Sequence, residues 1–319
     1  MRFLICGLGS MGKRRLRNLR ALGYEDIVGF DIRKDRRIEA EKYIVGATYE
    51  FDLTRVDAAI ICVPPRFHTQ YAEACVDAGV PCFMELDVYD FGIGKLADLA
   101  EEKDVLVAPS DTLRNYSDVR RMKEMLDKET YGKPWAFVGH TGQYLLDWHP
   151  WEGLNFYMSD KLTGGAIEVA SFDLIYLTWL FGFPVVCTKT VDKVSDINAD
   201  IFDIMSMQMK FANGVRGNIT TDVISRMNTR ILRIFCRDAV ISWDWGVGLT
   251  ISRDRPKLFE VFPATEHIVR QGYSEKIKEE PYIAEISNFI DAINGKKSYP
   301  YTLREVERRL KLLWDGIKV

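Results

Sequence analysis

The 319-residue sequence lacks a charge excess of either sign. Its 43 Lys and Arg residues stand against 46 Asp and Glu, a formal net charge of -3 with histidine neutral. A protein that is drawn to nucleic acid or to an anionic membrane by its overall field carries a positive excess, so the composition argues against both kinds of partner. We therefore expect a small-molecule ligand.

Long hydrophobic runs are missing as well. No apolar stretch approaches the roughly 20 residues that a membrane-spanning helix needs. Glycines interrupt the first twelve residues, where a secretory signal needs an unbroken apolar segment. The sequence thus predicts a cytoplasmic protein.

Cysteine and histidine are few and scattered. None of the six cysteines forms a Cys-x-x-Cys pair, and most lie among apolar, β-branched neighbours, which favours reduced core residues. The four histidines are widely separated, so their spacing predicts no metal site.

The first third of the chain alternates short apolar runs with helical patterns. The runs 3–6 and 27–30 have strand length, and 58–63 is apolar throughout and is stopped by two prolines, as in a strand buried on both faces. This alternation predicts an α/β fold that begins with a doubly wound parallel sheet of the Rossmann type.

Later segments are longer alternating strands separated by turn signals, which is typical of a mostly antiparallel sheet. We therefore predict two domains, a dinucleotide-binding Rossmann domain at 1–118 and an α+β substrate and oligomerisation domain at 119–319. A helical pattern at 165–181 belongs to the second domain. The strand segments are 135–144, 204–211, 215–223, 230–236 and 239–243.

A glycine-rich turn, residues 7–12, lies between the first predicted strand and a helix. Its three glycines permit a tight turn, a close approach of the backbone to a pyrophosphate, and close packing of helix on strand. Asp31 follows 19 residues after Gly12, at the end of the second strand, where a carboxylate can accept hydrogen bonds from the adenosine ribose. The motif predicts NAD as cofactor, and Arg33 and Lys34 leave NADP as the less favoured alternative.

Basic residues gather on the helix after the glycine turn. We interpret them as a solvated helix face, since charge runs on helices usually face water. These residues are Lys13, Arg14, Arg15, Arg17 and Arg20.

Several local patterns resemble the glucose-fructose oxidoreductase and inositol dehydrogenase family, called Gfo/Idh/MocA, over nearly the whole chain. Residues 62–68 resemble its Pro-x-x-x-His turn, and 79–85 are similar to the approach to its Glu-Lys-Pro motif. Arg114 stands where the family has an arginine after the sixth strand, and 164–182 resemble its glycine-opened helix in the substrate domain. The segment 143–152 is similar to a branch associated with sugar and surface-polysaccharide chemistry.

The resemblance implies an NAD-dependent oxidoreductase that acts on a sugar or sugar derivative. It also implies a homodimer or homotetramer that pairs through the open face of the second-domain sheet, for which we expect Trp243 and Trp245 to be exposed. Cofactor binding is expected at Gly7, Gly9, Ser10, Met11, Gly12, Asp31, Arg33, Val63, Pro64, His68 and Glu85. Substrate binding is expected at Arg114, Trp148, Tyr157 and Glu168.

The sequence departs from the family at the two residues that handle the hydroxyl proton. In the family a lysine follows the motif glutamate and acts with a histidine on the substrate-domain helix, but these places hold Leu86 and Phe172. Neither side chain has a titratable proton, and loss of a matched general acid or base typically costs 10²- to 10⁴-fold in rate. Asp87 replaces the motif proline.

Three residues are the candidates for this proton transfer. His149 titrates near neutrality and lies in an aromatic-rich segment, although a histidine satisfied in a structural turn before Pro150 is the simpler interpretation. Asp173 projects from the helix about 100° from position 172 and could face either the substrate or the domain interface. Tyr144 could donate a phenolic proton, or pack as most such tyrosines do.

Two other functions remain open. The departures at Leu86 and Phe172 favour a catalytically silent protein that keeps the cofactor and sugar sites as a sensor. A lyase or glycosidase-like reaction, in which NAD is transiently reduced and regenerated, would show turnover without net NADH.

Overall fold

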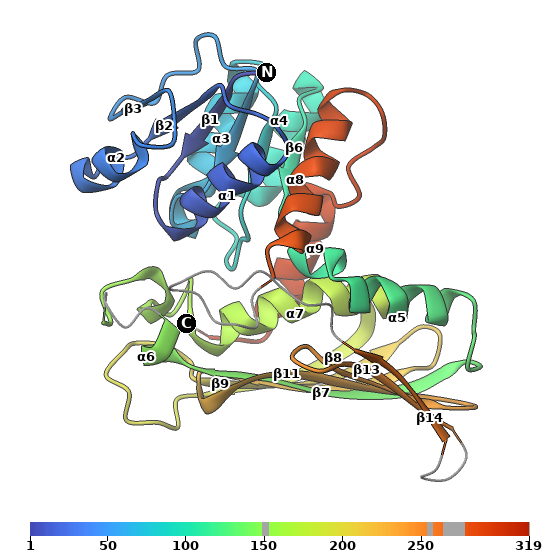
Figure 1. Cartoon of the computed structure of the whole chain (residues 1–319). Helices are drawn as coiled ribbons and strands as arrows, with labels where there is room; N and C mark the ends of the chain where they lie inside the picture. Colours follow the sequence, from blue (N-terminus) through green and yellow to red (C-terminus); the bar gives the residue numbers. More distant parts are fainter. Residues whose placement is uncertain (149–152, 254–257, 264–277, 319) are drawn as a thin grey trace. The chain divides into compact units, whose positions relative to one another are not determined.

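The computed structural model describes residues 1–148, 153–253, 258–263 and 278–318, and the chain divides into two compact units (Figure 1). Unit 1 comprises Met1–Thr112 and Glu279–Lys311, and unit 2 comprises Leu113–Lys278 and Leu312–Val319. The sequence predicted one boundary at residue 118. The structure has a further crossing, because Glu279–Lys311, near the end of the chain, belong to unit 1 again.

The sheet of unit 1 is parallel, with the strand order β3-β2-β1-β4-β5-β6 among the described residues. This order confirms the predicted doubly wound fold, in which the chain reverses its winding direction between β1 and β4. Every residue of β1 and of β4 is buried, as their unbroken apolar runs require. The strands are β1 (Phe3–Cys6), β2 (Ile27–Phe30), β3 (Gly46–Thr48), β4 (Ala58–Ile61), β5 (Cys82–Met84) and β6 (Val107–Pro109).

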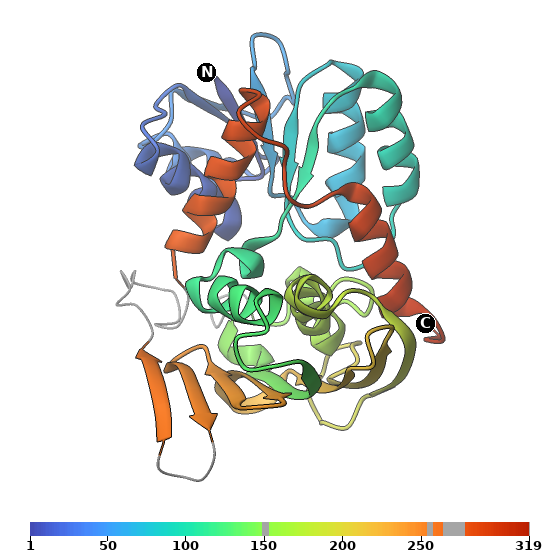
Figure 2. The ribbon, with the colours of Figure 1, turned by 90° about the vertical axis from the view of Figure 1, so that its right-hand side faces the viewer.

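Helices cover this sheet (Figure 2). Two of them come from the end of the chain: α8 packs beside α1, and α9 reaches α4 through ion pairs of Arg304 with Asp98 and Glu101. Their contacts explain why the late segment 279–311 belongs to unit 1. The helices are α1 (Ser10–Ala21), α2 (Lys34–Ala40), η1 (Pro65–Phe67), α3 (His68–Asp77), α4 (Ile93–Lys103), α8 (Glu280–Ile293) and α9 (Leu303–Trp314).

Two of the five basic residues of α1, Arg14 and Arg15, are buried, which corrects the interpretation of a solvated face for these two, while Arg20 is exposed. Arg15 is 0% exposed and pairs with Glu85 at 2.5 Å and with Glu285 at 2.7 Å. Arg14 is also buried and pairs with Glu279 of the segment that leads into α8. Buried charges need partners of this kind, so the arginines join α1 to β5 and to α8 rather than face water.

The sheet of unit 2 has the order β14-β13-β12-β11-β7-β10-β9-β8, and all its pairs are antiparallel except β7 with β10. This confirms the predicted second domain with a large, mostly antiparallel sheet. The strands are β7 (Pro134–Tyr144), β8 (Pro184–Asp192), β9 (Ile204–Phe211), β10 (Arg216–Asp222), β11 (Ile224–Cys236), β12 (Val240–Asp244), β13 (Gly248–Arg253) and β14 (Leu258–Pro263).

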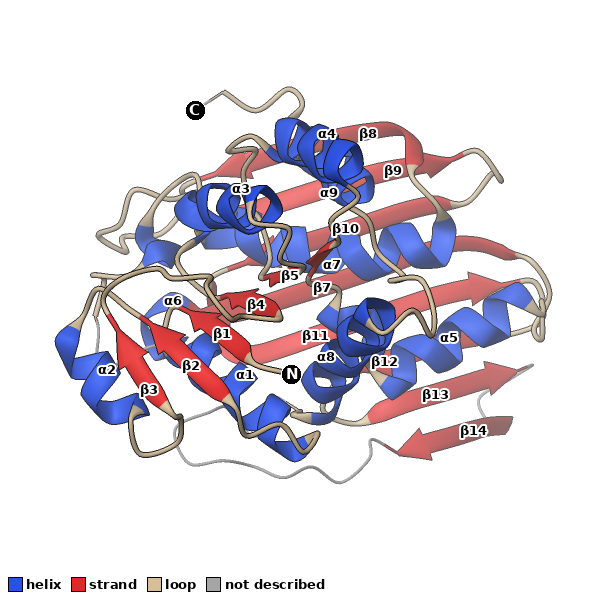
Figure 3. Ribbon diagram, turned by 90° about the horizontal axis from the view of Figure 1, so that it is seen from above, coloured by secondary structure: helices blue, strands red, loops and turns tan. Residues whose placement is uncertain are grey.

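Helices α5 (Ser117–Asp127) and α7 (Gly165–Phe181) run over one face of this sheet (Figure 3). Short elements α6 (Leu145–Trp148) and η3 (Tyr157–Ser159) lie between β7 and α7 in the sequence. Trp243 is buried under α5, where its indole nitrogen donates to Asp118, and Trp245 is buried too. The expectation that these two aromatics are exposed is therefore wrong.

Three further findings concern the described part of the chain. No helix there is long and apolar enough to cross a membrane, and no group of three or more His, Cys, Asp or Glu side chains is placed to hold a metal ion. All six cysteines are free thiols, and four of them are buried.

We expect Arg15→Ala to destabilise the protein by about 3–5 kcal/mol, because it leaves the carboxylates of Glu85 and Glu285 buried without their cation. Arg20→Ala on the exposed side of the same helix should change the free energy of unfolding by no more than about 0.5 kcal/mol. Urea unfolding of both variants measures the difference. Equal small effects would show that the buried cluster contributes little to stability.

Candidate cofactor and substrate sites

The glycine turn of unit 1 joins β1 to α1 at the point where the sheet reverses its winding. Gly7 has φ +96°, and a Cβ there would lie 2.8 Å from the backbone of Cys62 and Val63, just after β4. At Gly12 a Cβ would lie 1.8 Å from the carbonyl oxygen of Gly7. Both positions therefore need glycine to close the turn, and such a switch point is where open α/β sheets bind their ligands.

Gly9 stands at the N-cap of α1 and has a different surrounding. A Cβ there would meet only the guanidinium end of Arg36, at 3.2 Å. The helix start has no side-chain cap and no acidic residue in its first turn, so the first backbone amides of α1 and the positive end of its dipole stand at this turn. This geometry fits a pyrophosphate.

Asp31 follows β2, and its carboxylate is held in one orientation. The backbone nitrogens of Leu8 and Arg33 donate to its two oxygens, each at 2.8 Å. A carboxylate has about four acceptor sites, so sites for the two ribose hydroxyls remain. The residue is buried, which is the placement expected of an adenosine-ribose acceptor.

Two arginines lie near Asp31. The guanidinium of Arg33 is exposed and pairs with Asp35. Arg36, which sequence reasoning missed, lies 3.7 Å from the carboxylate of Asp31 and over Gly9. In the sequence, the signal that could have identified Arg36 is its place five residues after Asp31, in the first turn of α2.

The turn after β4 brings Val63, Pro64 and His68 together. His68 is buried, with Nε2 2.8 Å from the carbonyl oxygen of Val63 and Nδ1 3.0 Å from a carboxylate oxygen of Asp87. The carbonyl oxygen of Val63 can only accept, so Nε2 donates to it, and Nδ1 faces the Asp87 carboxyl. Burial lowers the pKa of His68, but the Asp87 carboxylate outweighs it and the net pKa is raised.

The segment after β5, where the family has Glu-Lys-Pro, is held by three basic side chains. Arg15 binds both carboxylate oxygens of Glu85. His68 pairs with the Asp87 side chain, and Arg309 of α9 donates to the Asp87 carbonyl oxygen at 2.9 Å. Leu86, between these anchors, is buried.

In unit 2, Asp173 of α7 faces the sheet. Its carboxylate accepts from the hydroxyl of Thr141 on β7 at 2.6 Å and from Nε of Arg230 on β11 at 3.0 Å. Burial raises the pKa of Asp173, and these two donors lower it in part. This carboxylate therefore joins helix α7 to the sheet.

A different stripe of α7 carries Glu168 and Phe172. At 100° per residue, Glu168, Phe172, Ile175 and Trp179 fall within one narrow sector, at least about 100° away from Asp173. Phe172 and Trp179 are the two α7 residues that are not fully buried, so this stripe faces away from the sheet. Glu168 thus shares its helix face with the position at which the family has its histidine.

Glu168 is 4% exposed, and among the described residues its hydrogen-bond partner is the hydroxyl of Tyr157, which donates to Oε1 at 2.9 Å. Its other oxygen, Oε2, is buried without a hydrogen-bond partner among the described residues. Burial raises the pKa of Glu168 to about 8, and the Tyr157 hydrogen bond opposes this rise. The carboxyl is therefore poised to gain or lose a proton near neutral pH.

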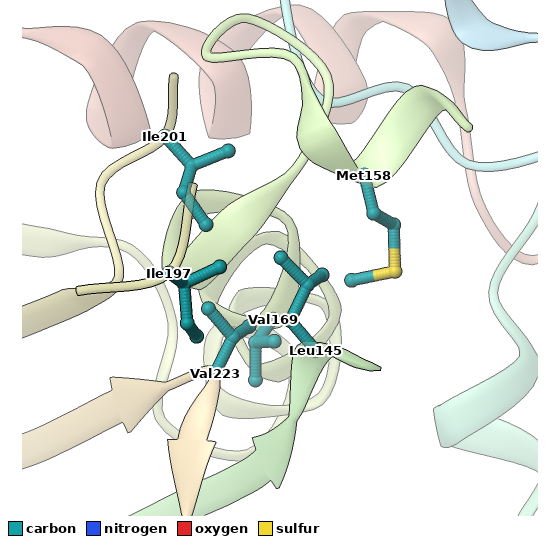
Figure 4. Close-up of a cluster of buried hydrophobic side chains, with 6 residues drawn as sticks. All are labelled: Leu145, Met158, Val169, Ile197, Ile201 and Val223. Carbon is teal, nitrogen blue, oxygen red and sulfur yellow. The ribbon is translucent and has the colours of Figure 1, made fainter. Parts of the chain in front are cut away.

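Apolar side chains surround this region of unit 2 and form the cluster in Figure 4. Three of the predicted aromatic residues, Tyr144, Trp148 and Tyr157, pack against it in partly buried positions. The guanidinium of Arg226 lies 3.6 Å above the ring of Tyr144. The structure therefore brings these candidates to one place. The cluster residues are Leu145, Met158, Val169, Ile197, Ile201 and Val223.

Two candidates lie elsewhere. Nε of the buried Arg114 donates to the carbonyl oxygen of Ile175, so at least this nitrogen holds helix α7. His149 falls outside the described residues.

Two family models match this chain. The model for the oxidoreductase family with an NAD-binding Rossmann fold matches residues 1–111, and the model for the GFO/IDH/MocA C-terminal domain matches residues 119–242. The chain belongs to the Gfo/Idh/MocA family. Its first unit is accordingly an NAD-binding Rossmann domain, as the glycine turn and Asp31 predicted. No curated protein sequence matches this family member.

Solved structures of similar fold include several dehydrogenases. An oxidoreductase from Agrobacterium radiobacter, in complex with NAD+, L-tartaric acid and magnesium, has a TM-score of 0.86 at 12% identity, over 98% of this chain and 94% of that one. Levoglucosan dehydrogenase with NADH and levoglucosan has 0.82 at 16%, over 98% and 95%. The UDP-N-acetylglucosamine 3-dehydrogenase of Acidithiobacillus ferrooxidans has 0.78 at 21%, over 98% and 95%. At these identities the likeness shows the Gfo/Idh/MocA fold.

We expect Asp31→Ala to weaken NAD+ binding roughly 10- to 100-fold, because hydrogen bonds to a charged group contribute about 1.5–3 kcal/mol each. Fluorescence titration with NADH measures the affinity. Asp77→Ala, which removes an exposed carboxylate of the same unit, is the matched control and should leave the affinity unchanged. Equal affinities for all three proteins would remove Asp31 from the cofactor site.

We expect Glu168→Gln to gain stability relative to the wild type as the pH rises. A carboxyl whose pKa is raised in the folded state keeps its proton longer there than in the unfolded chain, so the wild type loses stability between about pH 4.5 and about pH 8. The variant lacks this loss, and the difference should grow by about 4 kcal/mol over that window. Urea unfolding at pH 5 and pH 8.5 tests this. Parallel curves for the two proteins would show an ordinary pKa for Glu168.

Proposed function

We propose that the chain is an NAD-dependent oxidoreductase that oxidises a CH–OH group of a sugar or sugar derivative, using a proton relay that differs from that of its family. Family membership supports the cofactor and the reaction type. The levoglucosan and UDP-N-acetylglucosamine dehydrogenases of similar fold support the substrate class.

The observation that carries the proposed substrate class is the composition of the cluster in unit 2. Three aromatic side chains, Tyr144, Trp148 and Tyr157, converge there with the carboxyl of Glu168. Ligand sites typically combine apolar and aromatic walls with a few polar groups that fix orientation. Aromatic faces suit the C–H faces of a sugar ring, and the carboxyl suits its hydroxyls.

In the cofactor domain, this chain's residues position the dinucleotide. Gly9 and the start of α1 would receive the pyrophosphate, and Asp31 the adenosine ribose. The turn with Val63, Pro64 and His68, and Glu85 just after β5, would border the nicotinamide ribose. The bound cofactor would supply the hydride acceptor, and the clamps of Arg15 and Arg309 keep the Glu85–Asp87 backbone in place.

A catalytically silent sensor is the second candidate. Leu86 and Phe172 favour it, because neither can move a proton. One assay distinguishes the two candidate functions. Titration first shows that the purified protein binds NADH. The same protein is then tested for NADH formation on a panel of sugars, sugar acids and nucleotide sugars. Turnover supports the oxidoreductase, and bound cofactor without turnover on any member supports the sensor.

We also propose that the protein pairs through the uncovered face of the unit 2 sheet. The exposed residues Trp135, Val138 and Phe235 lie on β7 and β11, and Trp135 is 58% exposed. In the register of β7 with β11, Val138 lies opposite Arg233, and Ala136 lies opposite Phe235. Apolar side chains of the two strands therefore lie in adjacent rows. A homodimer or homotetramer is expected, and sedimentation of the protein with Val138→Asp should show a shift toward monomer.

We expect Leu86→Lys alone to raise the oxidation rate by less than about a hundredfold, because Phe172 still withholds the second proton group. The double variant Leu86→Lys, Phe172→His restores both family residues and is the informative comparison. Steady-state NADH formation measures the rates. A gain above a hundredfold from Leu86→Lys alone would show that the remaining residues already form a working family site.

A further inference from the structure

Arg230 of β11 carries hydrogen-bond donors that the fold does not use. Its side chain is 10% exposed, and its Nε donates to Asp173 of α7 at 3.0 Å. The terminal nitrogens Nη1 and Nη2 make no hydrogen bond in the part of the chain that the structure describes. The fully buried nitrogens that lack a partner do not include these two, so both can reach a ligand. Asp173 thus occupies one edge of the guanidinium, and the terminal edge is left for an acceptor.

A second donor lies beside this guanidinium. The Cζ atom of Arg230 lies 5.0 Å from the ring centroid of Trp245, the residue after β12. Trp245 is 8% exposed, and its indole Nε1 is buried with no hydrogen-bond partner among the described residues. Native structures seldom leave such a donor unless water or a ligand supplies the acceptor. The indole nitrogen therefore points to a ligand independently of Arg230.

Tyr176 brings a hydroxyl to the same place from α7. It lies three residues after Asp173, on the same side of the helix. Burial raises the pKa of Tyr176 well above its usual range, with a further rise from the Asp173 carboxylate and an opposing effect of Arg230. The phenol therefore keeps its proton and can donate it to an acceptor. No hydrogen bond of this hydroxyl is found among the described residues.

The three side chains lie on the face of the unit 2 sheet that α7 covers. The backbone nitrogen of Trp245 donates to the Arg230 carbonyl oxygen at 3.1 Å, so the two residues are neighbours on adjacent strands. Gly246, the next residue, is exposed, so the cluster lies close to the surface. Side chains alternate along a strand, which turns Asp244 to the other face, where its carboxylate accepts from the nitrogen of Gly246.

This cluster offers donors and a positive charge. Both oxygens of Asp173 already accept, one from Arg230 and one from the hydroxyl of Thr141. The terminal edge of a guanidinium matches the two oxygens of a carboxylate or phosphate, which it binds with parallel hydrogen bonds. An ionised acid only accepts, whereas a hydroxyl group would also bring a proton that needs an acceptor of its own. The chemistry of the cluster therefore favours an oxyanion over a neutral group.

We propose that Arg230, Trp245 and Tyr176 form an oxyanion site in unit 2, which binds the carboxylate or phosphate of a small ligand. The terminal nitrogens of Arg230 bind two of its oxygens, and the indole N–H and the phenol donate to the same group. Only the nature of the rest of the ligand, a sugar acid or a sugar phosphate, rests on the proposed function.

The first experiment measures ligand binding by the full chain saturated with NADH, using calorimetric titration. The probes are glucuronate, glucose-6-phosphate and neutral glucose. At least one of the two acids should bind about tenfold or more tightly than glucose. The comparison of the two acids distinguishes a carboxylate from a phosphate as the preferred oxyanion.

Two conservative variants test the donors in this titration. Arg230→Lys keeps a cation for Asp173 but loses the planar terminal edge, and Trp245→Phe keeps the ring but loses the N–H. Each should weaken binding of the preferred acid about tenfold and leave the affinity for NADH unchanged. The matched controls Arg216→Lys, exposed on β10, and Trp314→Phe, at the end of α9, should bind the acid as the wild type does.

The second experiment requires neither turnover nor a sugar. In the NMR spectrum of the protein with ¹⁵N-labelled tryptophan, the indole signal that is absent from Trp245→Phe belongs to Trp245. Titration with inorganic phosphate or acetate should move this signal downfield, because the N–H gains an acceptor. The signal of Trp135, which is exposed on the same sheet, should stay in place.

The outcomes separate the oxyanion site from the proposed function. If acids bind through Arg230 and Trp245 but no member of the sugar panel is oxidised, the proposed function fails and the oxyanion site stands. If the wild type oxidises neutral sugars while no acid binds more tightly than glucose and the Trp245 signal does not move, the oxyanion site is overturned and the function stands. Wild-type affinity for the acids in both Arg230→Lys and Trp245→Phe also overturns the site.

Discussion

Buried charge must be paired, and the cofactor domain depends on this constraint. Arg15 is fully enclosed between Glu85 and Glu285, which lie far apart in the sequence. Ser110 and Thr112 donate to the same Glu285 carboxylate. Because each charge is destabilising without the others, the cluster ties α1, the β5 segment and α8 into one arrangement, and the glycine turn is part of α1.

The same constraint explains the segment that replaces the family motif. Asp87 would be a buried unpaired carboxylate without His68, and the Asp87 carboxylate in turn raises the pKa of His68 against the effect of burial. The loss of the motif proline is thus matched by an ion pair that fixes the backbone on either side of Leu86. The cofactor site keeps a defined shape although it has no lysine at position 86, while in unit 2 the buried carboxyl of Glu168 lies one helical turn before Phe172.

Much of the fold could be predicted from the sequence because local patterns determine it. The apolar run 58–61 predicts a central strand, and the spacing from Gly12 to Asp31 predicts the cofactor turn. The burial of Arg15 could not be predicted, since its partner Glu285 lies 270 residues away. The direction of Asp173 was also open, because helical spacing alone does not say which stripe meets the sheet. The Tyr157–Glu168 contact was hidden because the two residues belong to different elements and their pairing depends on the close approach at Gly164.

The central claim is that NAD binding was retained while proton transfer passed to residues that differ from the family lysine and histidine. A crystal structure of the protein with NADH and a sugar substrate analogue tests this claim most directly. The reacting oxygen of the substrate is the one whose carbon faces C4 of the nicotinamide. The quantity to measure is the distance from this oxygen to each side-chain atom around it. We predict that a group other than a lysine amine or an imidazole lies within hydrogen-bond distance of that atom. A lysine amine or an imidazole in its place would contradict the account.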